Sequence, residues 1–273
     1  MDYDYWKKQA LDTPLYPDIE WSKPEQKGHA GKLGIIGGNS LGFAGVAEAY
    51  SVAINAGLGQ VRVLLPDILR KTIPPIITDT VFGPTNQSGS LTKDAIAEMN
   101  AVGEWATSVL LVGDAGRSSE TAIAYELFIQ SYQGPLVITR DAIDLVKNNA
   151  QALVDRENTV LVASFAQLQK LFQAVYYPKV LTFSMQLTNL VDALHKFTIT
   201  YPTTIVVLHK DSLLIAHKGE VISQPWGNPM AIWRGSVAAR AVSYWTWNLS
   251  KPLEAIAQSI QTNYPYRYVN NII

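Results

Sequence analysis

The segment from residue 32 to residue 66 constrains the fold of this chain more than any other stretch. Residues 32–36 read Lys-Leu-Gly-Ile-Ile, which is typical of a buried strand, and two glycines follow at once. Residues 44–56 are rich in small side chains and predict a helix, and residues 61–65 predict a second strand. Because a strand, a loop, a helix and a strand in this order form a right-handed crossover, the segment predicts a parallel sheet.

The loop between the first predicted strand and the helix is a candidate ligand site. It opens with Gly37 and Gly38, and the helix begins at Ala44 and Gly45. Helix N-termini present free N–H groups and the positive end of a dipole to anions, and glycine lets the backbone approach a ligand closely. The alternative is a tight turn that binds nothing. We favour a ligand crevice, because in open α/β sheets ligands bind at this edge.

Composition narrows the classes of function. The chain has 273 residues, 48% of them hydrophobic, which is enough for one large α/β domain or two small ones, and strands that alternate with helices along the whole length favour one. A net charge of −1 gives no general electrostatic reason to expect nucleic acid or an acidic membrane as a partner. The absence of cysteine excludes disulfides, thiolate metal sites and thiol catalysis. The four histidines are scattered along the chain, so we expect no histidine-rich metal site.

The sequence predicts two parts, an N-terminal arm and a single domain. Residues 1–26 hold several aromatic residues and prolines, which predict a short helix and an extended arm packed on the domain or on another subunit. Residues 27–273 are expected to form the domain. The polar, acidic start contains no secretory signal, and no apolar run is long enough to span a bilayer, so we expect a cytoplasmic location.

Strands alternate with helices along the rest of the chain. Further strands are predicted at residues 108–112, 136–139, 159–163 and 204–208, and a hairpin at residues 213–216 and 221–223. Further helices are predicted at residues 92–102, 119–131, 167–174, 184–197 and 253–263, with a long apolar helix ending at Leu249. Each strand delivers a glycine or small polar loop to one edge of the sheet. The pattern predicts an α/β fold with a mostly parallel central sheet.

These motifs occur in an order that resembles the ADP/ATP-dependent NAD(P)H-hydrate dehydratases of the ribokinase-like superfamily. The resemblance covers about residues 27–262 and is strongest in Ile-Ile-Gly-Gly-Asn-Ser and in Asn-Ala-Gly-Leu-Gly-Gln-Val-Arg-Val-Leu-Leu-Pro. It implies a three-layer α/β/α sandwich. It also implies an enzyme that phosphorylates the hydroxyl of hydrated NADH or NADPH from ATP or ADP, with or without Mg²⁺, and then eliminates phosphate.

The resemblance implies two groups of contact residues. The family's first Gly-Gly loop, a later glycine loop and two strand ends line its substrate site. The implied substrate contacts are Gly37, Gly38, Ala44, Gly45, Gly113, Gly116, Asp141 and Ser164. The implied nucleotide contacts are His209, Lys210, Asp211, Ser212, Gly227, Asn228, Arg234 and Gly235.

Several positions depart from the family pattern. The final Gly-Gly-X-Gly-Asp motif reads Trp-Arg-Gly-Ser, so its catalytic aspartate is Ser236. The family's Thr-Pro-His-Pro-Gly-Glu turn carries Ser164 and Gln167 in place of histidine and glutamate, and its nucleotide-loop lysine is His209. The Asp-Ala-Asp-Ala-Leu strand end reads Thr-Arg-Asp-Ala-Ile at residues 139–143. Because a general base contributes about 10²–10⁴-fold, the change at residue 236 implies weakened catalysis.

Spacing alone leaves the roles of several polar residues open. Asp114, Asp141 or Asp211 could replace the missing base. Arg234, a cation that the family motif lacks, could pair with phosphate or fill the pocket.

Three functions are therefore weighed. The first is a weakened NAD(P)H-hydrate dehydratase, and the second is a non-catalytic nucleotide-binding protein or scaffold. The third is a small-molecule, carbohydrate-like kinase, against which the loss of the aspartate counts equally.

Trp226 and Trp233 flank the last motif and are expected in the core or pocket wall, with stacking on a purine as the alternative. The expected partners are a small nucleotide or dinucleotide and further copies of the chain in a homo-oligomer.

Overall fold

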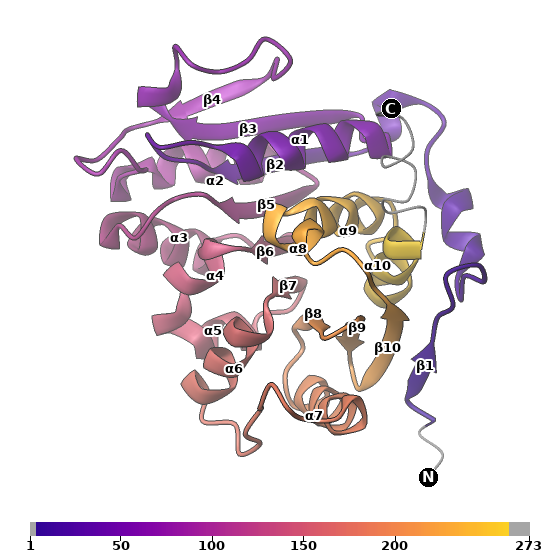
Figure 1. The fold of residues 1–273 in the computed structure, drawn as a ribbon. Helices are drawn as coiled ribbons and strands as arrows, with labels where there is room; N and C mark the ends of the chain where they lie inside the picture. Colours follow the sequence, from indigo (N-terminus) through magenta and orange to yellow (C-terminus); the bar gives the residue numbers. More distant parts are fainter. Residues whose placement is uncertain (1–3, 262–273) are drawn as a thin grey trace, which may run out of the picture.

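The computed structural model describes residues 4–261, which form a ten-stranded sheet covered by helices on both faces (Figure 1). The strands lie in the order β1-β10-β9-β8-β7-β6-β5-β2-β3-β4, and of the described strands only β9 runs against its neighbours. Their bounds are β1 Trp6–Lys8, β2 Lys32–Gly37, β3 Gln60–Pro66, β4 Thr80–Gly83, β5 Ser108–Gly113, β6 Leu136–Thr139, β7 Thr159–Ala163, β8 Thr204–His209, β9 Ser212–His217 and β10 Glu220–Pro225. The mostly parallel sheet is as predicted.

Two hydrophobic cores lie on the two faces of this sheet, one under each helical layer. One face packs against α1 Ala44–Ala56, α8 Met230–Arg234, α9 Ser236–Trp247 and α10 Pro252–Gln261. The other packs against α2 Ile96–Trp105, α3 Ser119–Ser131, α4 Asp141–Leu145, α5 Ala150–Asp155, α6 Phe165–Ala174 and α7 Leu187–Thr200. Because both faces are covered, the central strands are buried along almost their whole length. The predicted three-layer α/β/α sandwich is confirmed.

The sheet changes its direction of winding between β2 and β5. From β2 the chain runs outward to β3 and β4, and it then returns to β5 on the other side of β2. Ligands bind at such a point in open α/β sheets, outside the carboxyl ends of the strands. The loops there are in contact, since the Gly38 N–H donates to the Gly113 carbonyl at 2.7 Å.

Most local elements agree with the sequence pattern. The predicted helix at residues 44–56 is α1, and Gly57 ends it in the left-handed conformation with φ of 106°. The segment 141–155, for which no element was predicted, forms the short helices α4 and α5. The predicted final helix is α10 over its described part, and its predicted end at Asn263 lies outside the described residues.

The N-terminal arm is where the predicted secondary structure is wrong. Instead of a short helix, residues 6–8 form β1, which pairs in parallel with β10. The edge of β10 offers hydrogen-bond partners to the arm, and a helix of so few residues has too little stability to compete. The Trp6 Nε1–H donates to Ser223 Oγ at 2.8 Å, and Gln9 Nε2 donates to Gln224 Oε1 at 2.7 Å. The arm packs on its own domain, which is one of the two predicted alternatives.

The end of the β9–β10 hairpin carries a pH-sensitive group, His217. Burial, with a smaller contribution from Lys218, lowers the pKa of His217 to about 4, so the folded protein holds the ring neutral. Between the ordinary pKa of 6.5 and about 4, the unfolded chain binds the extra proton, and stability falls as the pH falls. Because His217 is only partly buried and solvent screens its charge, we expect His217→Gln to remove a loss on the order of 1–2 kcal/mol in urea unfolding at pH 4. His29→Gln, at an exposed histidine, is the control and should keep the parent profile.

Candidate functional site

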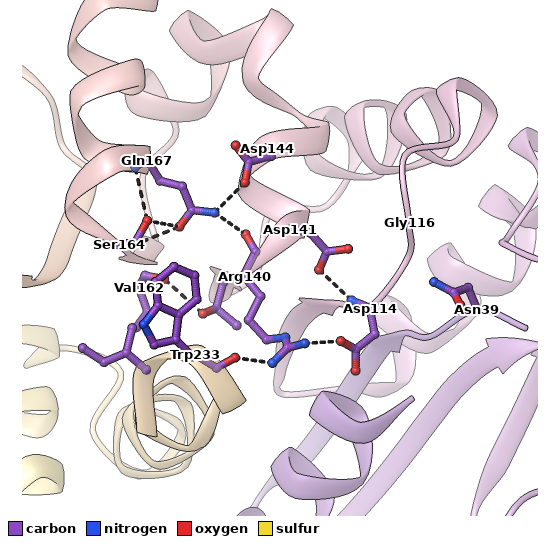
Figure 2. A pocket seen from close by; sticks show the side chains of 12 residues that line it. Asn39, Asp114, Gly116, Arg140, Asp141, Asp144, Val162, Ser164, Gln167 and Trp233 are labelled. Atoms are coloured by element: carbon purple, nitrogen blue, oxygen red, sulfur yellow. Dashed lines mark hydrogen bonds and ion pairs between the residues drawn. The ribbon is translucent and has the colours of Figure 1, made fainter. Parts of the chain in front are cut away.

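Loops from the carboxyl ends of β2, β5, β6 and β7, together with α8, surround a cavity of about 400 Å³ (Figure 2). The residues that line it are Asn39, Asp114, Gly116, Thr139, Arg140, Asp141, Asp144, Val162, Ser164, Gln167, Ile232 and Trp233. Of the predicted substrate contacts, three therefore line one cavity, namely Gly116, Asp141 and Ser164.

Gly37 and Gly38 shape this edge of the sheet but do not line the cavity. A Cβ on Gly37 would lie 2.2 Å from the Gly113 carbonyl oxygen, so a side chain there would separate the two loops. Gly38 has φ of 87°, and its missing Cβ would meet Leu65 Cδ2 at 2.7 Å, on the side of the core. Backbone packing accounts for both glycines, and their contact with a substrate stays a prediction.

Asp141 holds the loop after β5 in place. Its carboxylate accepts hydrogen bonds from the N–H groups of Asp114 at 2.7 Å and Ala115 at 3.0 Å. Burial raises the pKa of Asp141, and these two hydrogen bonds act in the opposite direction. Gly113 allows the approach, because a Cβ there would lie 2.0 Å from Asp141 Oδ1. Asp141 therefore positions the loop that carries Asp114.

Arg140 is the most important of the cavity residues that the sequence analysis missed, which also include Asn39 and Asp144. It lies directly after β6, where the NAD(P)H-hydrate dehydratases that the sequence resembles have alanine. Its backbone φ of 57° is one that residues other than glycine rarely adopt. Its guanidinium forms an ion pair with Asp114 and donates to the carbonyl oxygen of Trp233. Figure 2 shows the Arg140 side chain crossing to these two partners. The available signal was a large cation in place of a methyl group in the strand-end motif.

The Arg140 guanidinium lies close to two helix N-termini. A Cβ on Gly45, in the first turn of α1, would be 2.9 Å from Arg140 Cζ, and one on Gly235, just before α9, would be 3.5 Å from Arg140 Cδ. The Gly45 N–H also donates to Asp114 Oδ2 at 2.5 Å. The structure thus brings Gly45 and Gly235 together around one ion pair, whereas Ala44 is exposed.

Ser164 and Gln167, at the family's histidine and glutamate positions, form a capping box at the start of α6. Ser164 Oγ accepts from the Gln167 N–H at 3.2 Å, and Gln167 Oε1 accepts from the Ser164 N–H at 3.0 Å. Gln167 Nε2 also donates to the Arg140 carbonyl and to Asp144 Oδ2, each at 2.7 Å. This glutamine therefore helps to hold the unusual backbone of Arg140.

Ser236, at the position of the family's catalytic aspartate, is fully buried at the start of α9. Its hydroxyl donates to Glu48 Oε1 at 2.7 Å. Glu48 lies three residues after Gly45 in α1, so it is on the same side of that helix. Sequence reasoning missed Glu48, although this spacing on a predicted helix was a signal.

The turn between β8 and β9 carries four predicted nucleotide contacts, His209, Lys210, Asp211 and Ser212, and none of them lines the cavity. His209 is buried, with Nε2 3.0 Å from the Met185 carbonyl oxygen and its ring 4.9 Å from that of Phe165. Lys210 and Asp211 form the exposed turn. The Asp211 carbonyl accepts from the Trp226 N–H at 2.7 Å, which joins this turn to the segment before α8.

The segment before α9 carries the other predicted nucleotide contacts. Gly227 is exposed, and Asn228 Oδ1 accepts a backbone hydrogen bond in the first turn of α8. Trp226 is buried and donates to the Asn228 carbonyl at 2.7 Å. Arg234 is exposed and lies outside the cavity lining, so the cation in the crevice is Arg140. Trp233 lines the cavity and is 58% exposed.

Among the described residues, no three His, Asp or Glu side chains lie together as the ligands of a metal ion would. No helix within residues 4–261 is both long and apolar enough to cross a membrane.

Solved structures place this architecture among known folds. A ribokinase-like superfamily protein from Enterococcus faecalis superposes with a TM-score of 0.69 at 16% identity, over 96% of this chain and 87% of the other. The fold is ribokinase-like.

Two further structural neighbours were crystallised with a nucleotide or a nucleotide analogue. The ADP/ATP-dependent NAD(P)H-hydrate dehydratase from Bacillus subtilis, co-crystallised with ATP and Mg²⁺, has a TM-score of 0.59 at 11% identity, over 91% of this chain and 86% of its own. The pyridoxal kinase from Staphylococcus aureus, in complex with AMP-PCP and pyridoxal, has a TM-score of 0.54 at 12% identity, over 84% of each chain. Comparison of the sequence with protein families and with curated proteins finds no match. At these identities, the ribokinase-like fold is what the proteins share.

Proposed function

We propose that this ribokinase-like chain binds a nucleotide or dinucleotide at the carboxyl edge of its sheet and catalyses hydrate dehydration weakly or not at all. The proposal rests on the burial and the hydrogen bonding of Ser236. Its side chain is fully buried and donates to Glu48 at 2.7 Å. A serine held in this way offers no proton acceptor to a substrate hydroxyl, which is what the aspartate at this position provides in the resembling family.

Two further features support binding with poor catalysis. The Arg140–Asp114 ion pair occupies the space between Gly45 and Gly235, where substrate and phosphate would have to meet. The cavity beside it, at about 400 Å³, is within the usual size of small-molecule sites. Solved neighbours of the same fold hold ATP with Mg²⁺ or AMP-PCP.

The purified protein is expected to recover NADPH from hydrated NADPH at least about 100-fold more slowly than the Bacillus subtilis dehydratase under the same conditions, because it lacks the general base. The assay follows NADPH absorbance with ATP or ADP supplied. Turnover similar to that of the Bacillus enzyme would contradict poor catalysis. The nucleotide-binding part is tested by melting temperature, since a ligand at 100 times its Kd stabilises by about 2.7 kcal/mol. No shift with ATP, ADP or NADPH would contradict it.

A working dehydratase or small-molecule kinase is the second candidate, and Glu48 is the observation that favours it. Its carboxylate lies within hydrogen-bond distance of Ser236 Oγ, close to where an aspartate at residue 236 would act. If this candidate holds, turnover is measurable and Glu48→Gln lowers it by about 10²-fold or more. Measurable turnover that is unchanged in Glu48→Gln would remove the glutamate from consideration as the base.

A further inference from the structure

The Asp114 carboxylate occupies a position suited to a ligand anion. Oδ2 accepts from the Gly45 N–H in the first turn of α1 at 2.5 Å, and Oδ1 is ion-paired with Arg140. The Asp114 side chain is only 13% exposed and that of Arg140 23% exposed, so the pair is largely shielded from water. An amide at a helix N-terminus and a guanidinium are the groups that proteins use to bind phosphate.

The cavity beside this ion pair has donors without partners and acceptors that are already engaged. Asp141 accepts two backbone N–H groups, and Asp144 accepts Gln167 Nε2 at 2.7 Å and Lys170 Nζ at 3.2 Å. By contrast, Arg140 Nε is buried with no hydrogen-bond partner in the described structure. A ligand that brings acceptor oxygens would satisfy this donor once the ion pair opens, whereas the Asp141 and Asp144 carboxylates already accept two hydrogen bonds each.

Asn39 adds a second donor on the same cavity wall. Its Oδ1 accepts the Leu41 N–H at 2.7 Å, and its Nδ2 lies 3.5 Å from where a Cβ on Gly116 would stand. No residue in the described part of the chain accepts a hydrogen bond from that Nδ2. Figure 2 shows Asn39 across Asp114 from Arg140, so a ligand that reached both would pass the carboxylate.

We infer that a phosphate group of the bound ligand takes the place of the Asp114 carboxylate on Arg140, so that Asp114 is an internal competitor for the ligand. This inference rests on the proposed nucleotide binding and names the group that the site recognises. Arg140 then gains a partner for Nε and forms a bidentate contact with two phosphate oxygens. The ion pair lowers the apparent affinity, because only molecules in which it has opened can bind the phosphate.

The two partners of the ion pair should then change affinity in opposite directions. Arg140→Gln is expected to weaken ADP about tenfold, whereas Asp114→Asn, which is the same size and uncharged, should tighten ADP about tenfold. Adenosine, which has no phosphate, should respond to neither change. Arg62→Gln is the matched control, because it breaks the Arg62–Asp79 pair outside the cavity and should leave both affinities at the parent value.

Isothermal titration with ADP, adenosine and inorganic phosphate on the four proteins tests this inference, and circular dichroism confirms that each variant is folded. Should Arg140→Gln fail to fold, Arg140→Lys keeps the charge without the bidentate geometry and is expected to weaken ADP by less than tenfold. Equal ADP affinity in all folded variants, or weakening in both Arg140→Gln and Asp114→Asn, would overturn the inference while leaving nucleotide binding intact. Phosphate binding that follows the expected order without any ADP binding would uphold the inference and overturn the proposed function. If neither ADP nor inorganic phosphate binds, both the inference and the proposed function are overturned.

Discussion

Replacing Ser236 with aspartate is expected to destabilise the protein by about 3 kcal/mol and to leave the recovery of NADPH from its hydrate at the parent level. Ser236 is fully buried, and its hydroxyl bonds Glu48 at 2.7 Å, so the new carboxylate would face a carboxylate. A buried charge without a partner costs about 3–5 kcal/mol, and two carboxylates that share a site raise the pKa of one of them. The nearby Arg140 is already paired with Asp114. Urea unfolding measures the first effect, and NADPH absorbance measures the second.

A second substitution separates charge repulsion from loss of space. Ser236→Asp with Glu48→Gln should recover most of the lost stability, because the glutamine amide can donate to the new carboxylate. Ser119→Asp, which adds the same charge at an exposed position in the first turn of α3, should change stability little. Full family-like turnover in Ser236→Asp alone would show that residue 236 is the only defect of the site. A stable Ser236→Asp protein would contradict the expected repulsion from Glu48.

Replacing Gly37 with alanine is expected to lower the free energy of unfolding by about 3 kcal/mol or more. The new Cβ would lie 2.2 Å from the Gly113 carbonyl oxygen and 3.0 Å from Val46 Cγ2. That carbonyl is backbone and accepts the Gly38 N–H, so it cannot turn aside as a side chain would. Overpacking of a buried site usually costs about 1–3 kcal/mol, and a clash with backbone belongs at the upper end. Urea unfolding is again the measurement.

Gly28→Ala is the control for the Gly37 substitution. A Cβ at Gly28 has no atom within 4 Å, and the residue is exposed. The change should stay within about 0.5 kcal/mol of the parent, as surface substitutions usually do. If Gly37→Ala is as stable as Gly28→Ala, then the contact between the β2 and β5 loops is looser than the structure describes, and the backbone at this edge of the sheet is not rigid.

The fold was largely predictable because its signals are local. In α1, small residues end at Gly57, whose φ of 106° only glycine adopts easily, and this boundary is correct to the residue. The strands β2 and β3 are short apolar runs bounded by glycine and proline. The arm was predicted less well, since β1 exists only because the distant edge of β10 pairs with it.

The site was predictable only in part. The motifs located the edge of the sheet, and Gly45 and Gly235 do meet around one ion pair. They did not reveal Arg140, because a motif compares residues one by one, and the role of this arginine depends on its ion pair with Asp114, in the loop after β5. They placed emphasis on Arg234, which is exposed.

By itself, the sequence determined most of the strands and helices of the domain, the positions of the tight glycine turns and the edge of the sheet at which the cavity lies. These follow from hydrophobic period and from backbone conformations that few residues adopt, and both are written in neighbouring residues. Only the tertiary structure decided that Ser236 bonds Glu48 and that Arg140 bonds Asp114, since each pair joins segments at least 26 residues apart. Which charged side chains meet in the cavity depends on how the sheet and the helical layers pack, and no local sequence pattern specifies a contact between such distant segments.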